Sequence, residues 1–353
     1  MSGVRCHHRT MTARILSPRD LNRALLARQL LLDRAALTIP EAIEQVGGLQ
    51  TQYAPSGYVG LWSRLLDFPR ESLTTALEDR SVIQATLMRV TIHMVSRREF
   101  WRYALGVRQA RRVWALRIPN ATAGEGPMIE AATRLREALA AGPRSVKELG
   151  EMGAGFIGNL GLWVDLVRVP PSGTWERRRA DRLALADDWV GPPDTTEEEG
   201  LAHLVRSYLR AFGPAAWRDI ASWAGITATD AKRGGEGLTL ARYRDEDGRQ
   251  LVDLPDAPLP DAGAGVPVRF LPHWDANLLV HARRTGLLPE AYRPRVFSTR
   301  NPFSVGTYLV DGVVAGAWSL KDGRILLDAF RELTTAEERA VEREREALET
   351  FHS

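Results

Sequence analysis

The sequence is poor in cysteine and in long apolar runs. Cys6 is the only cysteine among 353 residues, so no disulfide can form within one chain, which fits a reducing compartment. No stretch approaches the roughly 20 apolar residues that a membrane helix needs. The first residues, MSGVRCHHRTMTAR, also lack the apolar core of a signal peptide. We therefore expect a cytoplasmic protein that does not bind a membrane.

The side chains that usually hold metals or phosphates are not grouped in the sequence either. Cys6, His7 and His8 are adjacent, but no later cluster of Cys or His has the spacing of metal ligands. A glycine-rich phosphate loop with its lysine, a nucleophile elbow and an HExxH helix are all missing. The sequence therefore predicts neither a metal nor a cofactor, and it gives no support to hydride transfer, phosphoryl transfer or standard hydrolase chemistry.

Lysine is scarce and arginine is abundant. Only Lys147, Lys232 and Lys321 are lysines, so 47 basic residues minus 3 leaves 44 arginines, against 44 acidic residues. A GC-rich genome is one explanation of this bias, and phosphate or guanine binding is another, because arginine forms planar bidentate contacts that lysine cannot. The net charge of only +3 means that any nucleic-acid surface is a local patch.

Helices followed by a strand ribbon recur along the chain. Ser17 and Thr38 each stand at the N-cap of a predicted helix, and Gly47-Gly48 ends the second of these helices. The run VIQATLMRVTIHMVS, residues 82–96, then alternates in a way that suits strands. This order is typical of a winged helix-turn-helix, and it appears twice more without obvious sequence identity. In the third copy Gly234-Gly235 cuts the predicted recognition helix short.

Short strands predominate after residue 266, with Asp311-Gly312 and Asp322-Gly323 as predicted hairpin turns, and a charged helix closes the chain. We therefore predict an α+β protein, mainly helical, with three tandem winged helix-turn-helix units and a small C-terminal antiparallel β-barrel. The expected units pack as one rigid body and the protein is expected to be a monomer. Their predicted bounds are 15–125, 126–192 and 193–260 for the winged helices, 261–330 for the barrel and 331–353 for the C-terminal helix.

Gln50 and Gln52 stand two residues apart in GGLQTQYAPS, just before an apolar stretch that should be buried. An amide is no general base near neutral pH, but it offers an acceptor and a donor in fixed geometry, so two amides can hold a water molecule. Such a site suits a leaving group that is already activated, and N7-alkylated guanine carries a positive charge before its bond to deoxyribose breaks. Alternatively, the two glutamines only satisfy backbone groups within a winged helix.

Four segments together resemble a known family. LQTQ after a helix pair, LMRVTIHMVS, YLRAFGPAAWRDIASWAG and FLPHWDANLLVHARR are similar to the tandem winged-helix DNA glycosylases of the AlkZ and YcaQ class, over about residues 15–330. The resemblance implies three winged helices and a β-barrel around a basic channel, and removal of N7-alkylpurines, including natural-product adducts and interstrand crosslinks. It also implies that Gln50 and Gln52 are catalytic, as the Gln-x-Gln form of the AlkZ branch, although Thr51 replaces the usual apolar middle residue.

Other polar residues near these segments are candidates for DNA or lesion binding. Arg89, Thr91 and His93 alternate on a predicted strand, so they share one face, where they form either a buried polar network or part of a lesion pocket. The HWDAN segment is expected to face DNA, and Trp274 either stacks on DNA or packs in the protein. The full set of candidates is Arg89, His93, Trp274, Asp275, Asn277, His281, Arg283 and Arg284.

The function predicted from these observations is excision of N7-alkylguanine, as a bulky adduct or interstrand crosslink, by hydrolysis of the N-glycosidic bond. The enzyme is expected to be a monofunctional DNA glycosylase that needs no cofactor and binds double-stranded DNA containing alkylated guanine. It would be nucleoid-associated and serve DNA repair or self-resistance to a genotoxic antibiotic. The alternative is a non-enzymatic transcriptional regulator, because a winged helix is a binding module first.

Overall fold

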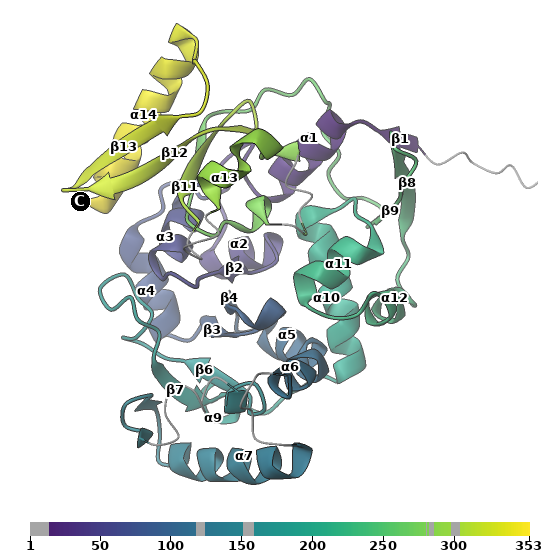
Figure 1. Ribbon diagram of the computed structural model, residues 1–353, viewed down its shortest axis with the longest axis vertical. Coiled ribbons are helices and arrows are strands. Elements are labelled where there is room, and N and C mark those ends of the chain that lie inside the picture. The colour runs from purple at the N-terminus through teal and green to yellow at the C-terminus, as the bar shows by residue number, and fades with distance from the viewer. Residues whose placement is uncertain (1–13, 118–123, 151–158, 280, 282–285, 298–303) are drawn as a thin grey trace, which may run out of the picture.

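The computed structural model describes residues 14–117, 124–150, 159–279, 281, 286–297 and 304–353. Helices and antiparallel sheets are packed together, with α7 at one end of the molecule and α14 beside β12 and β13 at the other (Figure 1). The α+β class is therefore confirmed. None of the described helices is both long and apolar enough to cross a membrane.

The first helices begin where their capping residues predict. The side chain of Ser17 accepts from the backbone N–H of Asp20, whose carboxylate accepts from the Ser17 backbone, and Thr38 and Glu41 repeat this reciprocal pairing. Gly47 has φ of 76°, which lets the chain leave the second helix in a left-handed turn. The helices of this region are α1 (Pro18–Arg28), α2 (Ile39–Gln45), α3 (Pro55–Trp62) and α4 (Arg70–Glu78).

One six-stranded sheet joins the regions predicted as the first two winged helices. Its strand order is β2-β4-β3-β6-β7-β5, and β3 pairs with β6 so that Gln84 lies opposite Arg168. The two regions therefore share a sheet, and the predicted boundary at residue 125 stays a prediction. The strands are β2 (Leu49–Gln50), β3 (Val82–Thr86), β4 (Ile92–Ser96), β5 (Arg144–Ser145), β6 (Leu166–Arg168) and β7 (Arg182–Leu185).

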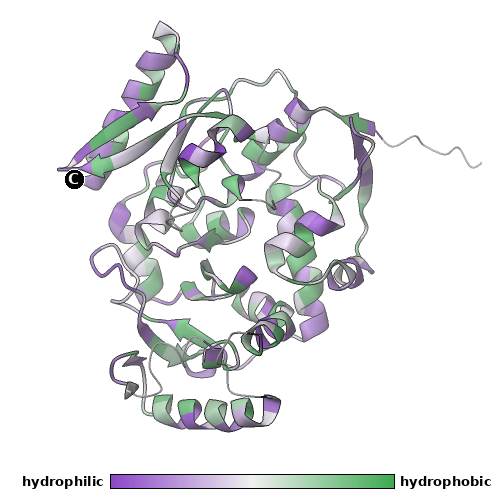
Figure 2. Cartoon of the chain, in the orientation of Figure 1, coloured by the Kyte–Doolittle hydropathy of each residue, from purple (hydrophilic) through white to green (hydrophobic). Residues whose placement is uncertain are grey.

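Helices cover this sheet and connect it to the rest of the molecule. The short helices α5 (Phe100–Gly106) and α6 (Arg108–Ala115) follow β4, and α7 (Glu125–Leu139) and α9 (Ala186–Val190) flank the second half of the sheet. Hydrophobic residues gather on the central elements, whereas hydrophilic and hydrophobic residues alternate along α7 (Figure 2). Three tryptophans, Trp62, Trp163 and Trp223, are buried in the core, and Trp217 packs against it partly buried.

The region predicted as the third winged helix contains α10 (Glu197–Phe212), α11 (Trp217–Ala224), α12 (Ala228–Gly235) and the hairpin of β8 (Ala241–Asp245) and β9 (Gln250–Asp253). The N-terminal strand β1 (Arg14–Leu16) adds to this hairpin in parallel with β8, which the sequence did not predict. Helix α10 runs through the largest hydrophobic cluster of the described residues and carries Leu204, Tyr208 and Phe212 into it.

The last strands form a four-stranded antiparallel sheet in the order β10-β11-β12-β13. Asp311-Gly312 and Asp322-Gly323 make its turns, as predicted, with positive φ at all four residues. No pairing closes β10 onto β13 in the described part of the chain, so the barrel and the three winged helices stay predictions. The elements here are β10 (Arg269–Leu271), α13 (Arg293–Val296), β11 (Gly306–Val310), β12 (Val313–Lys321), β13 (Arg324–Ala329) and α14 (Thr335–His352).

Helices α5 and α10 touch through a pair of glycines. A Cβ on Gly106 would lie 2.7 Å from the Gly200 carbonyl oxygen. We therefore expect Gly106→Ala to lower the free energy of unfolding by about 1–3 kcal/mol, because the helices must move apart. Gly126→Ala is the control, since no atom lies within 4 Å of its Cβ. Thermal unfolding measures both, and a Gly106→Ala protein as stable as the wild type would contradict the close helix contact.

Candidate functional site

Gln50 and Gln52 lie at one edge of the six-stranded sheet, where Gln50 is partly buried and Gln52 is exposed. Gln50 pairs with His93 across β2 and β4, and its Oε1 accepts from an Arg89 Nη2 donor at 2.6 Å. Gln52 Oε1 accepts from the backbone N–H of Ile92 at 3.2 Å. Both amide NH₂ groups lack a protein partner among the described residues, and each oxygen keeps a second lone pair. The edge therefore presents two oriented amides.

Thr51 points to the opposite side, into the core. It is 1% exposed, and its Oγ1 accepts from Gln84 Nε2 at 3.2 Å. Its methyl group lies near Gly57, because a Cβ added to that glycine would be 3.0 Å from Thr51 Cγ2. The methyl thus takes the place that an apolar residue would occupy, and the hydroxyl is satisfied. Thr51 thus separates Gln50, at the end of β2, from Gln52, in the bend that follows the strand.

Arg89 lies in a turn, and the prediction that it shares a strand face with Thr91 and His93 was wrong. The 3₁₀ turn η1 (Met88–Val90) separates β3 from β4, and φ is 51° at Arg89 and 58° at Val90. This left-handed conformation costs roughly 1–2 kcal/mol per residue. Contacts from another region hold it, because Arg89 Nη1 donates to the Trp223 carbonyl and Gly225 packs against the Arg89 backbone.

No carboxylate pairs with Arg89 among the described residues, although burial lowers the pKa of its guanidinium to about 10. It is therefore still charged near pH 7, and it can only donate hydrogen bonds. The Gln50 amide must turn its oxygen toward this donor, which fixes the direction of the amide. Arg89 is thus a positioning residue for Gln50.

On the expectation from the sequence that Gln50 is catalytic in a DNA glycosylase, Arg89→Met should lower the rate of base release by about 10-fold or more, because Gln50 then loses the group that orients it. Single-turnover kinetics measure the rate. Arg97→Met is the matched control, since Arg97 also donates to a backbone carbonyl, that of Val190 at 2.7 Å, but follows the other end of β4. Equal rates in the Arg89→Met and Arg97→Met proteins would refute the positioning role.

His93 is neutral and has a defined tautomer. Burial, and then the charge of Arg89, lower the pKa of His93 to about 3. Its Nδ1 lies 3.0 Å from the Thr91 carbonyl oxygen, which can only accept, so Nδ1 carries the proton and Nε2 keeps a lone pair. The ring is 2% exposed and is the cross-strand neighbour of Gln50. A neutral acceptor therefore lies beside the two amides.

The HWDAN segment lies largely inside the protein. Asp275 is 6% exposed and forms a buried ion pair with Arg64 at 2.9 Å, and Asn277 donates to Asp275 at 2.8 Å and to Gln29 at 3.3 Å. The protein satisfies the Asp275 carboxylate and the Asn277 amide nitrogen, whereas Asn277 Oδ1 is buried without a partner among the described residues, and neither residue is on an exposed strip. Asp275 and Asn277 therefore have little exposed surface with which they could contact DNA directly.

The remaining candidates have different environments. Trp274 is half-buried, has φ of 61° and approaches the ring of Phe297 at 6.4 Å. His281 is buried against Phe212, neither ring nitrogen has a hydrogen-bond partner among the described residues, and burial holds its pKa well below the usual range. Arg283 and Arg284 lie outside the described residues. The roles predicted for all the candidates in DNA or lesion binding stay predictions.

A pocket of about 400 Å³ opens beside Gln52, and it contains an arginine that sequence reasoning missed. Arg168 donates to Thr86 Oγ1 at 2.8 Å and to the Ala180 carbonyl, with no carboxylate partner among the described residues. Burial lowers its pKa to about 10. Trp114, which is 48% exposed, lies at the same pocket. The place of Arg168 in this pocket could not be predicted from its spacing in the sequence, because its contacts come from distant segments.

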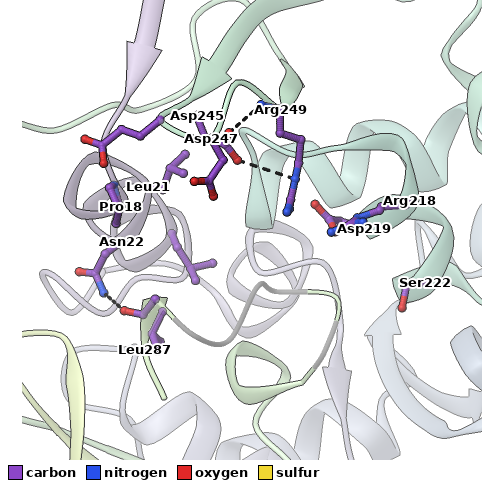
Figure 3. Close-up of a pocket in the computed structure, with 13 residues that line it drawn as sticks. Pro18, Leu21, Asn22, Arg218, Asp219, Ser222, Asp245, Asp247, Arg249 and Leu287 are labelled. Carbon is purple, nitrogen blue, oxygen red and sulfur yellow. Dashed lines mark hydrogen bonds and ion pairs between the residues drawn. The ribbon is translucent and has the colours of Figure 1, made fainter. Parts of the chain in front are cut away.

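A second pocket, of about 560 Å³, lies between α1, α11 and the β8–β9 hairpin (Figure 3). Its lining includes two arginines, Arg218 and Arg249, but four carboxylates. Negative charge repels phosphates, so this face of the third region does not suit a DNA backbone. The carboxylates are Asp219, Asp245, Glu246 and Asp247.

Comparison with known proteins agrees with the resemblance seen in the sequence. The AlkZ-like DNA glycosylase family matches residues 43–351, which include both glutamines. The chain belongs to this family. It is therefore a DNA glycosylase, a hydrolase that acts on N-glycosidic bonds of DNA in repair.

The solved structure of the Streptomyces sahachiroi DNA glycosylase AlkZ has the same fold, with a TM-score of 0.79. Its sequence is 18% identical, and the similarity covers 94% of this chain and 95% of that chain. No curated protein matches the chain. Among the described residues, no group of three Cys, His, Asp or Glu side chains is placed to hold a metal ion.

Proposed function

We propose that this AlkZ-like glycosylase excises N7-alkylguanine from double-stranded DNA, as a monomer and without a cofactor. The observation that carries the proposal is the pair of oriented amides at the sheet edge, with Gln50 fixed by Arg89 and Gln52 by the Ile92 N–H. His93, the cross-strand neighbour of Gln50, stays neutral and so supplies no proton to the leaving base. A site of this kind suits a substrate whose leaving group is activated before it binds.

The chemistry needs only a positioned water molecule. Its oxygen attacks C1′ of the deoxyribose while the bond from C1′ to N9 of the base breaks. The electron pair of that bond passes to the base and neutralises the charge on N7, so no acid must protonate the base. The free lone pairs of the two amide oxygens accept the water protons, one of which then passes to solvent. Gln50 and Gln52 thus hold the water, and the product is an intact abasic site.

The pocket beside Gln52 supports a bulky adduct or crosslink as the substrate. Its volume of about 400 Å³ exceeds what a methyl group on N7 requires. Apolar side chains such as Leu162 and Leu166 line it together with Arg168. A natural-product adduct with an apolar body and a hydrogen-bond acceptor would fit this lining, which supports a role in resistance to a genotoxin.

Release of the base from a defined duplex tests the proposal. The protein is mixed with duplex DNA that contains 7-methylguanine or a bulkier N7 adduct, and the free base and the DNA strand are followed separately. We expect the free base together with an uncleaved strand that carries an abasic site. Release of neither base would exclude the proposed activity, and strand cleavage without added alkali would exclude the monofunctional mechanism.

DNA binding is expected to weaken steeply with salt, because arginine contacts to phosphates release counterions. Arg177 is exposed on the loop between β6 and β7 and makes no ion pair among the described residues. Arg177→Ala should reduce the slope of log affinity against log salt concentration by about 1. Fluorescence anisotropy of a labelled duplex between low and physiological salt measures the slope. An unchanged slope would show that Arg177 does not contact a phosphate.

A further inference from the structure

A third pocket is lined by Tyr53, the residue that follows Gln52, and the proposed mechanism does not use this pocket. Its volume is about 240 Å³. Segments that are far apart in the sequence form it, because its lining comes from α3, the β6–β7 loop, the residues that follow β10, β12 and the end of α14. Five of the lining residues carry rings, and we call them the aromatic cage: Tyr53, Trp175, His273, Trp318 and His352.

The rings of the aromatic cage contact one another in succession around the pocket. Tyr53 and His273 have ring centroids 5.6 Å apart, and His273 and Trp318 are 5.8 Å apart. Trp318 is 6.0 Å from His352, which is 5.3 Å from Trp175. The circle is completed by the exposed Arg178, whose guanidinium lies 5.8 Å from the ring of Tyr53 and 5.9 Å from that of Trp175.

One buried polar atom at this pocket is unsatisfied. Ser56 is 3% exposed, and its buried hydroxyl has no hydrogen-bond partner among the described residues. A buried hydroxyl without a partner costs roughly 1–3 kcal/mol, so its presence indicates a ligand atom or water that it bonds. Ser56 lies on α3 and lines the pocket together with the aromatic cage.

Both histidines of the aromatic cage present a hydrogen-bond acceptor. Nδ1 of His273 lies 2.7 Å from the Ser304 carbonyl oxygen, and Nδ1 of His352 lies 2.8 Å from that of Leu348. Burial lowers the pKa of both rings, so each is neutral near pH 7. A carbonyl only accepts, so Nδ1 carries the proton and Nε2 keeps its lone pair. Neither Nε2 has a hydrogen-bond partner in the part of the chain that the structure describes.

We infer that the aromatic cage binds a guanine base, which rests on the proposed function and deepens it. A purine stacks on aromatic rings, and the positive charge of an N7-alkylated base adds a cation–π attraction. Guanine also offers N1–H and an exocyclic NH₂ as donors for the two Nε2 atoms, and its O6 as an acceptor for the Ser56 hydroxyl. Adenine has no N1–H and no O6, so the same groups would satisfy it less well.

The size and position of the pocket agree with a base as the occupant. Drug-sized ligands need about 300–1,000 Å³, so about 240 Å³ suits a single ring system. Tyr53 directly follows Gln52 in the chain, which places the aromatic cage next to the proposed water site. The base bound there is either still attached to DNA or already released, and the two cases share the same chemistry.

The first test is binding of free 7-methylguanine, followed by quenching of tryptophan fluorescence. Caffeine is the matched ligand, because it is an N7-methylated purine without N–H donors. We expect 7-methylguanine to bind at least about 10-fold more tightly than caffeine, because two donor–acceptor pairs are lost with caffeine. Equal affinity for the two ligands, or no binding of either, would overturn the assignment.

Ser56→Ala tests the residue itself. We expect it to weaken the binding of 7-methylguanine and of caffeine alike, by about 5- to 20-fold, because both ligands carry the O6 carbonyl; thermal stability should be nearly unchanged, because the lost hydroxyl has no partner among the described residues. Ser63→Ala is the control: Ser63 caps the other end of α3 and bonds the Val59 carbonyl, so its loss should lower stability and leave binding intact. Unchanged 7-methylguanine binding in Ser56→Ala would contradict the role of the pocket.

Kinetics then separate the two sources of the base. If the aromatic cage holds guanine in DNA, Ser56→Ala slows single-turnover release. If it holds the released base, single-turnover release is unchanged and 7-methylguanine becomes a weaker product inhibitor; a variant that alters neither would overturn the inference. Base binding to a protein that releases no base from DNA would leave the aromatic cage standing and refute only the proposed function.

Discussion

Gln50→Ala should lower the single-turnover rate of 7-methylguanine release by about 100-fold or more, because the attacking water then loses one of the two amides that hold it. The loss should appear in the rate of the chemical step and not in DNA affinity. Among the described residues the Gln50 side chain bonds Arg89 alone, so its removal leaves one donor of this buried guanidinium without its partner. The rate is therefore compared between samples with the same folded fraction, so that the loss measured is chemical.

Gln52→Ala should reduce release to a similar extent, with one structural difference. Its Oε1 accepts from the Ile92 N–H, so truncation leaves that donor to solvent and lowers stability by about 1 kcal/mol. Thr51→Val is the control, because Thr51 lies between the two glutamines in the sequence. It keeps the methyl that packs near Gly57 but removes the hydroxyl bonded to Gln84. A Gln52→Ala protein that is less stable yet fully active would mean that this glutamine only satisfies the backbone.

Asp275→Ala should lower the free energy of unfolding by about 3–5 kcal/mol, because it leaves the charge of Arg64 buried without its partner. The two side chains are 2.9 Å apart and are 2% and 3% exposed. Chemical denaturation measures this loss directly. The partner substitution Arg64→Met with Asp275→Leu should recover most of it, since apolar pairs can replace buried ion pairs at little cost.

The Asp275→Ala substitution also distinguishes two roles for the HWDAN segment, DNA binding and stabilisation of the fold. If Asp275 or Asn277 contacted DNA, substitution would change DNA affinity at unchanged stability. The buried positions predict the reverse, with DNA affinity of the folded fraction unchanged. A stable Asp275→Ala protein with altered DNA binding would contradict the buried ion pair.

The sequence was sufficient for features that depend on neighbouring residues. Capping by Ser17 and Thr38, the ends of helices at glycine and the Asp-Gly hairpin turns all follow from local backbone preferences, and the structure confirms them. The family, too, could be predicted, because its motifs lie in continuous segments that include Gln50 and Gln52.

Contacts between distant segments could not be predicted. Arg64 and Asp275 are 211 residues apart, and neither carries a local signal of the other. Alternation placed Arg89 on a strand, but two consecutive left-handed residues form a turn there, and contacts with Trp223 and Gly225 hold it. The pairing of β3 with β6 likewise joins the first two predicted winged helices, which the periodicity of the sequence alone divides.

The most direct test of the central claim compares the wild type with a protein carrying both Gln50→Ala and Gln52→Ala, at enzyme concentrations that saturate the DNA. The measured quantity is the single-turnover rate constant for release of 7-methylguanine from duplex DNA. We predict release by the wild type and a loss of about 100-fold or more in the double variant, close to that of Gln50→Ala alone, because the two amides act on one water molecule. Release by the double variant at the wild-type rate, with DNA binding unchanged, would contradict the claim that this pair of glutamines carries the chemistry.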